Sequence, residues 1–379
     1  MPGLYIHIPF CRQACTYCDF HFSTSPHYRA DVVKSIIREI EFRADQWQEE
    51  PMKTVYFGGG TPSQLLPNEL DEIFNAVHRN FKINSGAEIT FEANPEDLKV
   101  DYIKHLKSIG INRLSIGIQS FRDPDLIQMN RAHNAAQAIS SVEQAANEGI
   151  SSISVDLIYG IPGLSNEAWL EQLNIAAKLP INHLSCYALT VEQGTPLAKM
   201  INQGKRKNTD DEQAENHFQL LQNWAPSEGF SHYEVSNLAR EGGRAKHNSA
   251  YWSGESYLGI GPSAHSFQNN VRRFNIPNNQ MYIRSLRDGD AEHEIENLQT
   301  HERYNEIVLT GMRTSTGIDK NEILKTGKAF MDFFLDILEN HPDRNQISQT
   351  NTHILLSPNA WFRADGIASD FFFLTDFSK

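Results

Sequence analysis

Short apolar runs alternate with helical patterns over the first half of the chain. Six runs of four to eight residues are rich in Ile, Val, Thr, Tyr and Phe, which favours β-strands. They are Leu4–Ile8, Thr54–Phe57, Glu88–Asn94, Arg113–Gln119, Ile153–Gly160 and His183–Thr190. Between them apolar residues recur at the period of a helix, as Val32, Val33, Ile36, Ile37 and Ile40 do. This α/β alternation predicts a parallel sheet with helices outside, as a partial or full (β/α) barrel.

The alternation of strand and helix patterns ends after Thr190, which indicates that structural units of another kind follow the barrel. We expect residues 1–200 to form the barrel core and residues 201–295 to extend it. From about Thr300 the patterns are helical again, so residues 296–379 are expected to form a small, mostly helical C-terminal domain. The last run, "WFRADGIASDFFFL", predicts a turn and short strands. In a parallel barrel, functional residues are expected where the strands end.

Composition narrows the class of protein. Of 379 residues, 40% are hydrophobic and 21% are charged, which is ordinary for a globular protein. The 34 basic and 47 acidic residues give a net charge of −13, which argues against a general binder of nucleic acid or anionic membranes. The first ten residues lack the basic and apolar regions of a signal peptide, and no apolar run approaches the length of a transmembrane helix. We therefore expect a cytoplasmic protein.

Three of the four cysteines, Cys11, Cys15 and Cys18, lie within eight residues. Thiols stay reduced in the cytosol, where clustered cysteines more often bind metal than form disulfides. Three thiolates on one loop can hold a [4Fe–4S] cluster with one iron left open, or a zinc ion with His7 or His21 as fourth ligand. The spacing leaves both alternatives open. Cys186, in a predicted strand, is expected to be a small buried hydrophobe.

Polar or glycine-rich groups follow several predicted strands. Gly58, Gly59 and Gly60 in "VYFGGGTPS" allow the backbone to approach a ligand closely. Glu92 and Asp156 are carboxylates near strand ends, where an acidic side chain can bind the hydroxyls of a ribose. Each of these features alone also fits a tight turn or a solvated loop.

Together these marks resemble the radical S-adenosylmethionine (SAM) superfamily. The spacing Cys-x3-Cys-x2-Cys with Tyr17 before the last cysteine, followed by the glycine motif, carries the resemblance. In that family the cysteines hold a [4Fe–4S] cluster whose open iron chelates SAM, and an electron from the cluster cleaves SAM to a radical. The resemblance therefore implies the cluster, SAM and an electron donor. The cysteine ligands would be Cys11, Cys15 and Cys18.

The set of SAM contacts resembles the branch of the superfamily that contains coproporphyrinogen oxidase. By that resemblance, SAM would be bound by Tyr5, Gly58, Gly59, Gly60, Thr61, Glu92, Gln119, Arg131 and Asp156. The sequence "GIPG" at residues 160–163 resembles the loop that lies near the adenine in this branch.

Two members of the branch compete as interpretations. One is the oxygen-independent coproporphyrinogen III oxidase, which decarboxylates a porphyrinogen. The other is the HemW family of heme chaperones, which bind heme and pass it to an acceptor protein. The oxidase carries a further cysteine where this chain has Phe20, and a long arm before its cysteines, whereas Cys11 lies near the start here. Whether the chain is an enzyme stays open at this stage.

The sequence "KHNSAYW" resembles the His-Asn-x-x-Tyr-Trp motif of the heme chaperones. His247 and Tyr251 are both residue types that bind heme iron, and their spacing of four places them on one face of a helix. Arg244 or Lys246 would suit a heme propionate. The motif also fits a structural loop in which His247 only donates or accepts hydrogen bonds. We expect a HemW-type protein with heme as its ligand at His247 and Tyr251.

Overall fold

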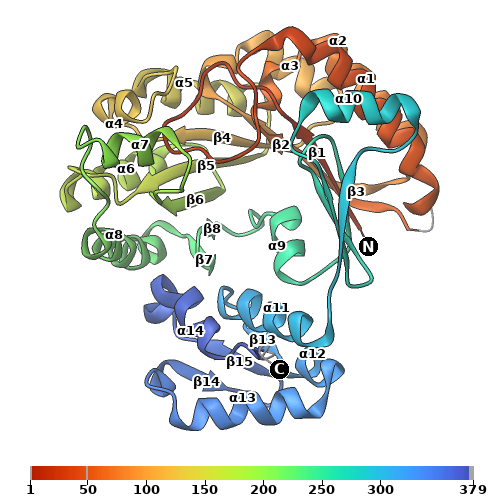
Figure 1. Cartoon of the computed structure of the whole chain (residues 1–379). Coiled ribbons are helices and arrows are strands. Elements are labelled where there is room, and N and C mark those ends of the chain that lie inside the picture. The colour runs from red at the N-terminus through yellow and green to blue at the C-terminus, as the bar shows by residue number, and fades with distance from the viewer. Residues whose placement is uncertain (1, 48–49, 375–379) are drawn as a thin grey trace.

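The computed structural model describes residues 2–47 and 50–374. Twelve strands form one curved sheet in the order β12-β11-β10-β9-β1-β2-β3-β4-β5-β6-β8-β7 (Figure 1). The six predicted strands form its centre and pair in parallel. They are β1 (Gly3–Ile8), β2 (Met52–Gly59), β3 (Ile83–Ala93), β4 (Arg113–Gln119), β5 (Ser152–Tyr159) and β6 (His183–Ala188). The described strands leave two edges, β12 and β7, so the barrel is partial.

The first helices alternate with these strands and cover the convex face of the sheet (Figure 1). They are α1 (Arg29–Arg43), α2 (Pro67–Asn80), α3 (Val100–Ser108), α4 (Asp123–Gln128), α5 (Ala135–Asn147) and α6 (Asn166–Lys178). In α1 the predicted apolar face is buried, with Val32, Ile36 and Ile40 fully covered. The predicted α/β alternation is confirmed.

Alternation along each strand gives the sheet one apolar and one polar face. In β1, Leu4, Ile6 and Ile8 are fully buried in the apolar core. Tyr5 and His7 point to the opposite, concave side, because successive side chains of a strand alternate. Cys186 of β6 belongs to the apolar core, as the sequence predicts. The concave face is therefore the polar surface on which a site can be built.

Residues after β6 extend both edges of the sheet. The elements are α7 (Pro196–Asn202), α8 (Asp211–Trp224), β7 (Ser231–Glu234), β8 (Asn237–Ala239), α9 (Lys246–Trp252), β9 (Tyr257–Ile260), β10 (His265–Gln268), β11 (Val271–Asn275), α10 (Asn279–Asp288) and β12 (His293–Asn297). Strand β8 pairs antiparallel with β6, and β9 pairs parallel with β1. Between them α9 lies on the concave side of the sheet (Figure 1).

The C-terminal elements pack below the open side of the barrel, next to α9 (Figure 1). They are α11 (Thr300–Met312), β13 (Ile318–Asp319), α12 (Lys320–Thr326), α13 (Lys328–Asn340), β14 (Ile347–Gln349), β15 (His353–Leu356) and α14 (Ala364–Asp370), with a small sheet in the order β13-β15-β14. The short strands predicted for residues 361–374 are wrong. This segment forms a 3-10 helix and α14, because Ala364, Ile367, Ala368 and Phe371 are buried at helical spacing.

None of the helices in the described ranges combines the length and the apolar character needed to cross a membrane.

Candidate functional site

The cysteine loop follows β1 and is held by hydrogen bonds to distant segments. The Cys11 amide donates to the Ser23 carbonyl at 3.0 Å, and the Thr16 amide donates to the Met129 carbonyl at 3.1 Å. The Cys11, Cys15 and Cys18 thiols are free and partly exposed. The loop thus has a fixed path, with three thiols accessible from its surface.

Two polar side chains reach the sulfur atoms. The Thr61 hydroxyl donates to the Cys11 sulfur at 3.3 Å, and the Arg131 guanidinium donates to the Cys15 sulfur at 3.2 Å. Burial raises the pKa of Cys11 to about 12, although the Thr61 hydrogen bond opposes this effect, and raises the pKa of Cys18 to about 11. A metal centre that binds thiolates would replace these protons.

Both histidines of the zinc alternative make hydrogen bonds through their rings. His7 donates from Nε2 to the His21 carbonyl at 3.0 Å, and its Nδ1 pairs with the Tyr5 hydroxyl at 3.2 Å. His21 pairs through Nε2 with the Asn279 side chain at 2.9 Å. Within the described ranges, no three His, Cys, Asp or Glu side chains converge on a single ion. Three separate thiols on one loop fit a [4Fe–4S] cluster better, because each thiolate there binds a different iron.

The glycine loop at the end of β2 runs against the start of the cysteine loop. A Cβ on Gly60 would lie 2.8 Å from the Ile8 carbonyl oxygen and 2.9 Å from the Phe10 amide nitrogen. Gly59 has a φ of 104°, a conformation that side chains disfavour. Only glycine therefore allows the two loops to approach this closely.

Two half-buried carboxylates lie on the concave side of the sheet. Glu92 of β3 accepts a hydrogen bond from the Tyr56 hydroxyl at 2.6 Å, and Asp156 of β5 accepts one from the Ser115 hydroxyl at 3.3 Å. Burial raises the pKa of Glu92 to about 7 and that of Asp156 to about 6, and the Asp156 charge further raises the pKa of Glu92. These carboxylates can accept hydrogen bonds from a ligand rich in hydroxyl groups.

A small cavity lies between these carboxylates. Its volume is about 60 Å³, and its lining includes Glu92, Asp156, Thr90 and Asn248. Among the described residues, the buried Thr90 hydroxyl has no hydrogen-bond partner. Such an orphaned group next to two carboxylates fits a site that is completed by a polar ligand.

Arg131 joins the cysteine loop to the strand ends. Its guanidinium donates to the Asn94 side chain and to the Gly117 carbonyl, both at 2.6 Å, in addition to Cys15. Its Nε is buried and has no partner within residues 2–47 and 50–374. Asn94 in turn donates to the Thr61 hydroxyl at 3.3 Å. Asn94 was not singled out by sequence reasoning, although it lies two residues after Glu92 in "FEANP".

Gln119 closes β4 in a left-handed conformation with a φ of 71°, which is uncommon for a residue other than glycine. The register between β4 and β5 shifts at the same place. The chain thus leaves the regular sheet where the resemblance places a SAM contact.

The predicted heme motif forms α9, whose first turn is capped by Glu88 of β3. Its carboxylate accepts the amide protons of Lys246 at 2.9 Å and His247 at 3.0 Å. His247 is only 2% exposed, and its two ring nitrogens pair with the Thr54 hydroxyl at 2.7 Å and the Tyr251 hydroxyl at 3.0 Å. Burial lowers the pKa of His247 to about 3, so the ring is neutral. The predicted shared face of His247 and Tyr251 is present: His247 is buried against the barrel, while Tyr251 also lines a large cleft.

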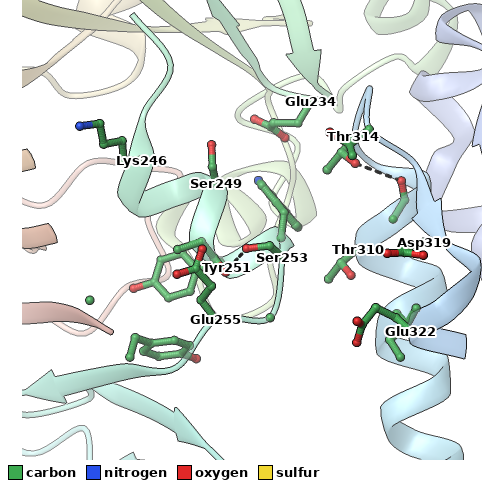
Figure 2. A pocket seen from close by; sticks show the side chains of 18 of the residues that line it. Glu234, Lys246, Ser249, Tyr251, Ser253, Glu255, Thr310, Thr314, Asp319 and Glu322 are labelled. Carbon is green, nitrogen blue, oxygen red and sulfur yellow. Dashed lines mark hydrogen bonds between the residues drawn. The ribbon is translucent and has the colours of Figure 1, made fainter. Parts of the chain in front are cut away.

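Helix α9 forms one wall of this cleft, which is shown in Figure 2. The cleft has a volume of about 1060 Å³ and lies between α9 on one side and α11, β13 and α12 on the other. Ser253 faces Thr310, Asp319 and Glu322 across it, whereas the side chain of Lys246 points away from that wall (Figure 2).

Aromatic and cationic groups pair along this cleft. The Arg244 guanidinium lies 5.1 Å from the ring centre of Tyr233, and the Arg303 guanidinium lies 5.6 Å from that of Phe267. Trp252 also lines the cleft. Flat apolar surfaces beside cations suit a planar ligand with acidic groups. The sequence did not predict this cleft, because its walls come from segments between Gly3 and His353.

The predicted site residues thus fall into two groups. The cysteines, the glycine loop, Thr61, Glu92, Gln119, Arg131 and Asp156 lie on the carboxyl-terminal side of the parallel strands or project from their concave face. His247 lies beside Gly3 and Thr54, where β1 and β2 begin, and Tyr251 lies next to it.

Comparisons with known proteins show which family the chain belongs to. Residues 5–175 match the family model of the Radical SAM superfamily. The heme chaperone HemW of Bacillus subtilis (strain 168) is 30% identical over 361 residues, which cover 94% of this chain and 95% of that protein. The heme chaperone HemW of Mycobacterium tuberculosis (strain ATCC 25618 / H37Rv) is 34% identical over 289 residues, covering 75% of this chain and 74% of that protein.

One solved structure has a similar fold over nearly the whole chain. It is coproporphyrinogen III oxidase (HemN) from Escherichia coli, a radical SAM enzyme, with a TM-score of 0.85 at 23% identity. The match covers 98% of this chain and 90% of that one. At this identity the similarity concerns the fold.

Proposed function

Since this chain belongs to the family of the heme chaperone HemW within the radical SAM superfamily, we propose that it is itself a heme chaperone. It would bind a [4Fe–4S] cluster and SAM, take up heme, and pass the heme to an acceptor protein. The observation that carries the proposal is that α9 lines two hollows. One is the small cavity between Glu92 and Asp156, and the other is the cleft of about 1060 Å³.

The cluster would be held by Cys11, Cys15 and Cys18, whose thiols are free and share one loop. When bound, the cluster supplies an electron that can cleave SAM, and a separate electron donor would reduce it. Thr61 and Arg131 already donate hydrogen bonds to two of the sulfur atoms, and such bonds tune iron–sulfur centres.

The residues for SAM are those that the resemblance implies. Glu92 and Asp156 would accept hydrogen bonds from ribose hydroxyls, and Gly58–Gly60 would allow the methionine end to approach the backbone. Within the described ranges the Nε of Arg131 has no hydrogen-bond partner, so it could donate to an anionic or carbonyl group of SAM. Tyr5, Thr61 and Gln119 complete the proposed contacts.

Heme would bind in the cleft, whose volume is at the upper end of the range for pockets that enclose small molecules. Arg244 and Lys246, both in the lining, would pair with its propionates. His247 and Tyr251 stay the predicted iron ligands. To bind iron, His247 must first release a hydrogen bond to Thr54 or Tyr251.

The test is an anaerobic assay of the reconstituted protein with SAM and a reductant. Half of the sample receives heme and half receives coproporphyrinogen III. We expect stoichiometric heme binding and no release of carbon dioxide. Loss of two carboxyl groups from coproporphyrinogen would contradict the proposal and identify an oxidase. The same protein with bound heme is then mixed with an apo heme protein, and transfer is followed by the Soret bands of the two proteins after separation.

A further inference from the structure

Three aromatic rings, those of Tyr5, Tyr56 and His247, form a cluster on the concave face of the sheet. The ring centres are 6.0 Å apart for Tyr5 and Tyr56, 4.9 Å for Tyr56 and His247, and 6.4 Å for Tyr5 and His247, so Tyr56 has its shortest ring contact with His247. The planes are within 27° and 24° of parallel in the two pairs that contain Tyr56. The His247 ring is fixed by hydrogen bonds at both nitrogens, to Thr54 and Tyr251. Tyr56 therefore packs against an imidazole that has one defined orientation.

The free end of Tyr56 reaches the proposed SAM site. Its hydroxyl donates to Glu92 Oε1 at 2.6 Å, the short distance typical of a hydrogen bond to a charged acceptor. Gly58 leaves room for this pair, because a Cβ there would lie 2.8 Å from the Tyr56 ring and 2.9 Å from Glu92 Oε1. The position of the Glu92 carboxylate thus depends on the Tyr56 ring, and the Tyr56 ring packs on His247.

We infer that Tyr56 and His247 are positioning residues for SAM, with His247 fixing the Tyr56 ring and Tyr56 fixing the Glu92 carboxylate. The inference rests on the proposed function, since it requires that Glu92 bind SAM. It gives the helix of the predicted heme motif a second role on its barrel side. The cleft side of α9 stays available for heme, because His247 is almost fully buried while Trp252 lines the cleft.

The hydrogen bond has a further consequence for the charge on Glu92. A phenol that donates to a carboxylate favours the ionised form and lowers the pKa of that carboxyl group, which burial otherwise raises. An ionised Glu92 is the stronger acceptor for a ribose hydroxyl. The titratable or charged groups near Glu92 are Tyr5, Tyr56, Asp156, Tyr187, Tyr251, and, in the lining of the small cavity, Arg113 and His183.

The experiment measures SAM binding to the reconstituted protein by anaerobic titration calorimetry. We expect Tyr56→Phe, which keeps the ring and removes only the hydroxyl, to weaken SAM binding about 10-fold, the loss of one hydrogen bond to a charged group. His247→Ala should weaken it by a similar factor. In the double variant, SAM binding should be weakened by no more than about the larger of the two single-variant factors, because both residues act through the same carboxylate.

Two matched control variants remove a tyrosine hydroxyl and a histidine ring away from the proposed SAM site. Tyr102→Phe deletes a tyrosine hydroxyl that donates to the Leu65 carbonyl, and His232→Gln replaces a half-buried histidine that bonds to the Val235 carbonyl. Neither residue contacts the proposed SAM site, so both variants should bind SAM as the wild type does. Iron and sulfide content is measured in every sample, so that weaker binding is not confused with loss of the cluster.

The pH dependence separates positioning from a general loss of structure. Without the Tyr56 hydroxyl the pKa of Glu92 rises, so the midpoint pH for SAM binding should move up by about one unit in Tyr56→Phe. If both Tyr56→Phe and His247→Ala bind SAM with wild-type affinity and with an unchanged midpoint pH, the inference is overturned but the proposed function stands. A wild-type protein that carries its cluster but binds no SAM would overturn the proposed function, and the inference with it.

Discussion

The guanidinium of Arg131 donates to the sulfur of Cys15 at 3.2 Å, although the two residues are 116 positions apart in the chain. The same side chain bonds to Asn94 and Gly117 at 2.6 Å. One arginine therefore connects the cysteine loop to the ends of β3 and β4.

Replacing Arg131 by Gln should loosen the cysteine loop from the sheet. Three hydrogen bonds from a charged donor are lost, and we expect SAM affinity to fall on the order of 10- to 100-fold while the barrel stays folded. The measurements are SAM titration and the rate at which the reduced cluster is lost to a chelator. Arg284→Ala, an exposed arginine on α10, is the control. Unchanged affinity and cluster lifetime would contradict the role assigned to Arg131.

Replacing Cys11, Cys15 and Cys18 together by Ala should abolish iron and sulfide binding after anaerobic reconstitution. The thiols lie on a surface loop and contribute little to the apolar core, so circular dichroism should still show a folded protein. Cys186→Ala is the matched control and should keep the full iron content, since Cys186 is buried on the convex face. Full iron and sulfide in the triple variant would exclude these cysteines as ligands.

Gly60→Ala should destabilise the protein and disturb the cysteine loop. The added Cβ meets backbone atoms of Ile8 and Phe10 at 2.8 to 2.9 Å, and backbone cannot move aside cheaply. We expect a loss of about 1–3 kcal/mol in the free energy of unfolding, measured by urea denaturation. Gly366→Ala in α14 meets no atom within 4 Å and should be neutral or stabilising. Equal stability of the two variants would show that the close approach is not needed.

Glu92→Gln should make the metal-free protein more stable above pH 7. The pKa of Glu92 is about 7 in the folded protein, above its ordinary value of 4.5. Between these values the folded state holds a proton that the unfolded state has released, so the wild-type stability falls as pH rises from about 4.5 to 7. Because glutamine does not titrate, the variant avoids this loss of stability, which amounts to a few kcal/mol at most.

The measurement for Glu92 is urea unfolding at pH 5 and pH 8. The difference between the variant and the wild type should grow with pH. Asp156→Asn should show the same sign over a lower window, from 3.8 to about 6. A constant difference across this range would mean that Glu92 is not held in its protonated form by burial.

Arg244→Ala should weaken heme binding about 3- to 10-fold, because one propionate loses a charged partner at a partly exposed site. The measurement is a Soret titration of the reconstituted protein. His247→Ala and Tyr251→Phe are titrated in parallel, and a change in the Soret maximum of either identifies an iron ligand. Identical spectra and affinities in all three would place heme outside the cleft.

The central sheet was predictable because its strands are buried on the convex face and recur in order. β4 has the predicted bounds Arg113–Gln119, since its apolar alternation is strong and turn residues flank it. The segment after Trp361 was misjudged, because the run Phe371–Phe373 has high strand propensity. There the helical spacing of buried residues in α14 and the stacking of Phe371 on Phe334 decide the structure.

The site was predictable only where it is local in the sequence. The cysteines and glycines are recognisable because their spacing is fixed by a single loop each. The orientation of His247 was not predictable, because it depends on Thr54, 193 residues away, and on Glu88. The cleft depends on how the C-terminal elements pack against α9, which no short pattern encodes.

Strand β3 carries Glu88, which caps α9, and Glu92, four residues further along the same face. At about 3.3 Å per residue, the Cα atoms of the two residues are about 13 Å apart along a strand that pairs with β2 at Glu88 and with β4 from Thr90 onward. Such a strand acts as a rod of fixed length between the two sites. A ligand in the cleft that acts on α9 therefore cannot change the spacing between Glu88 and Glu92 without breaking the sheet.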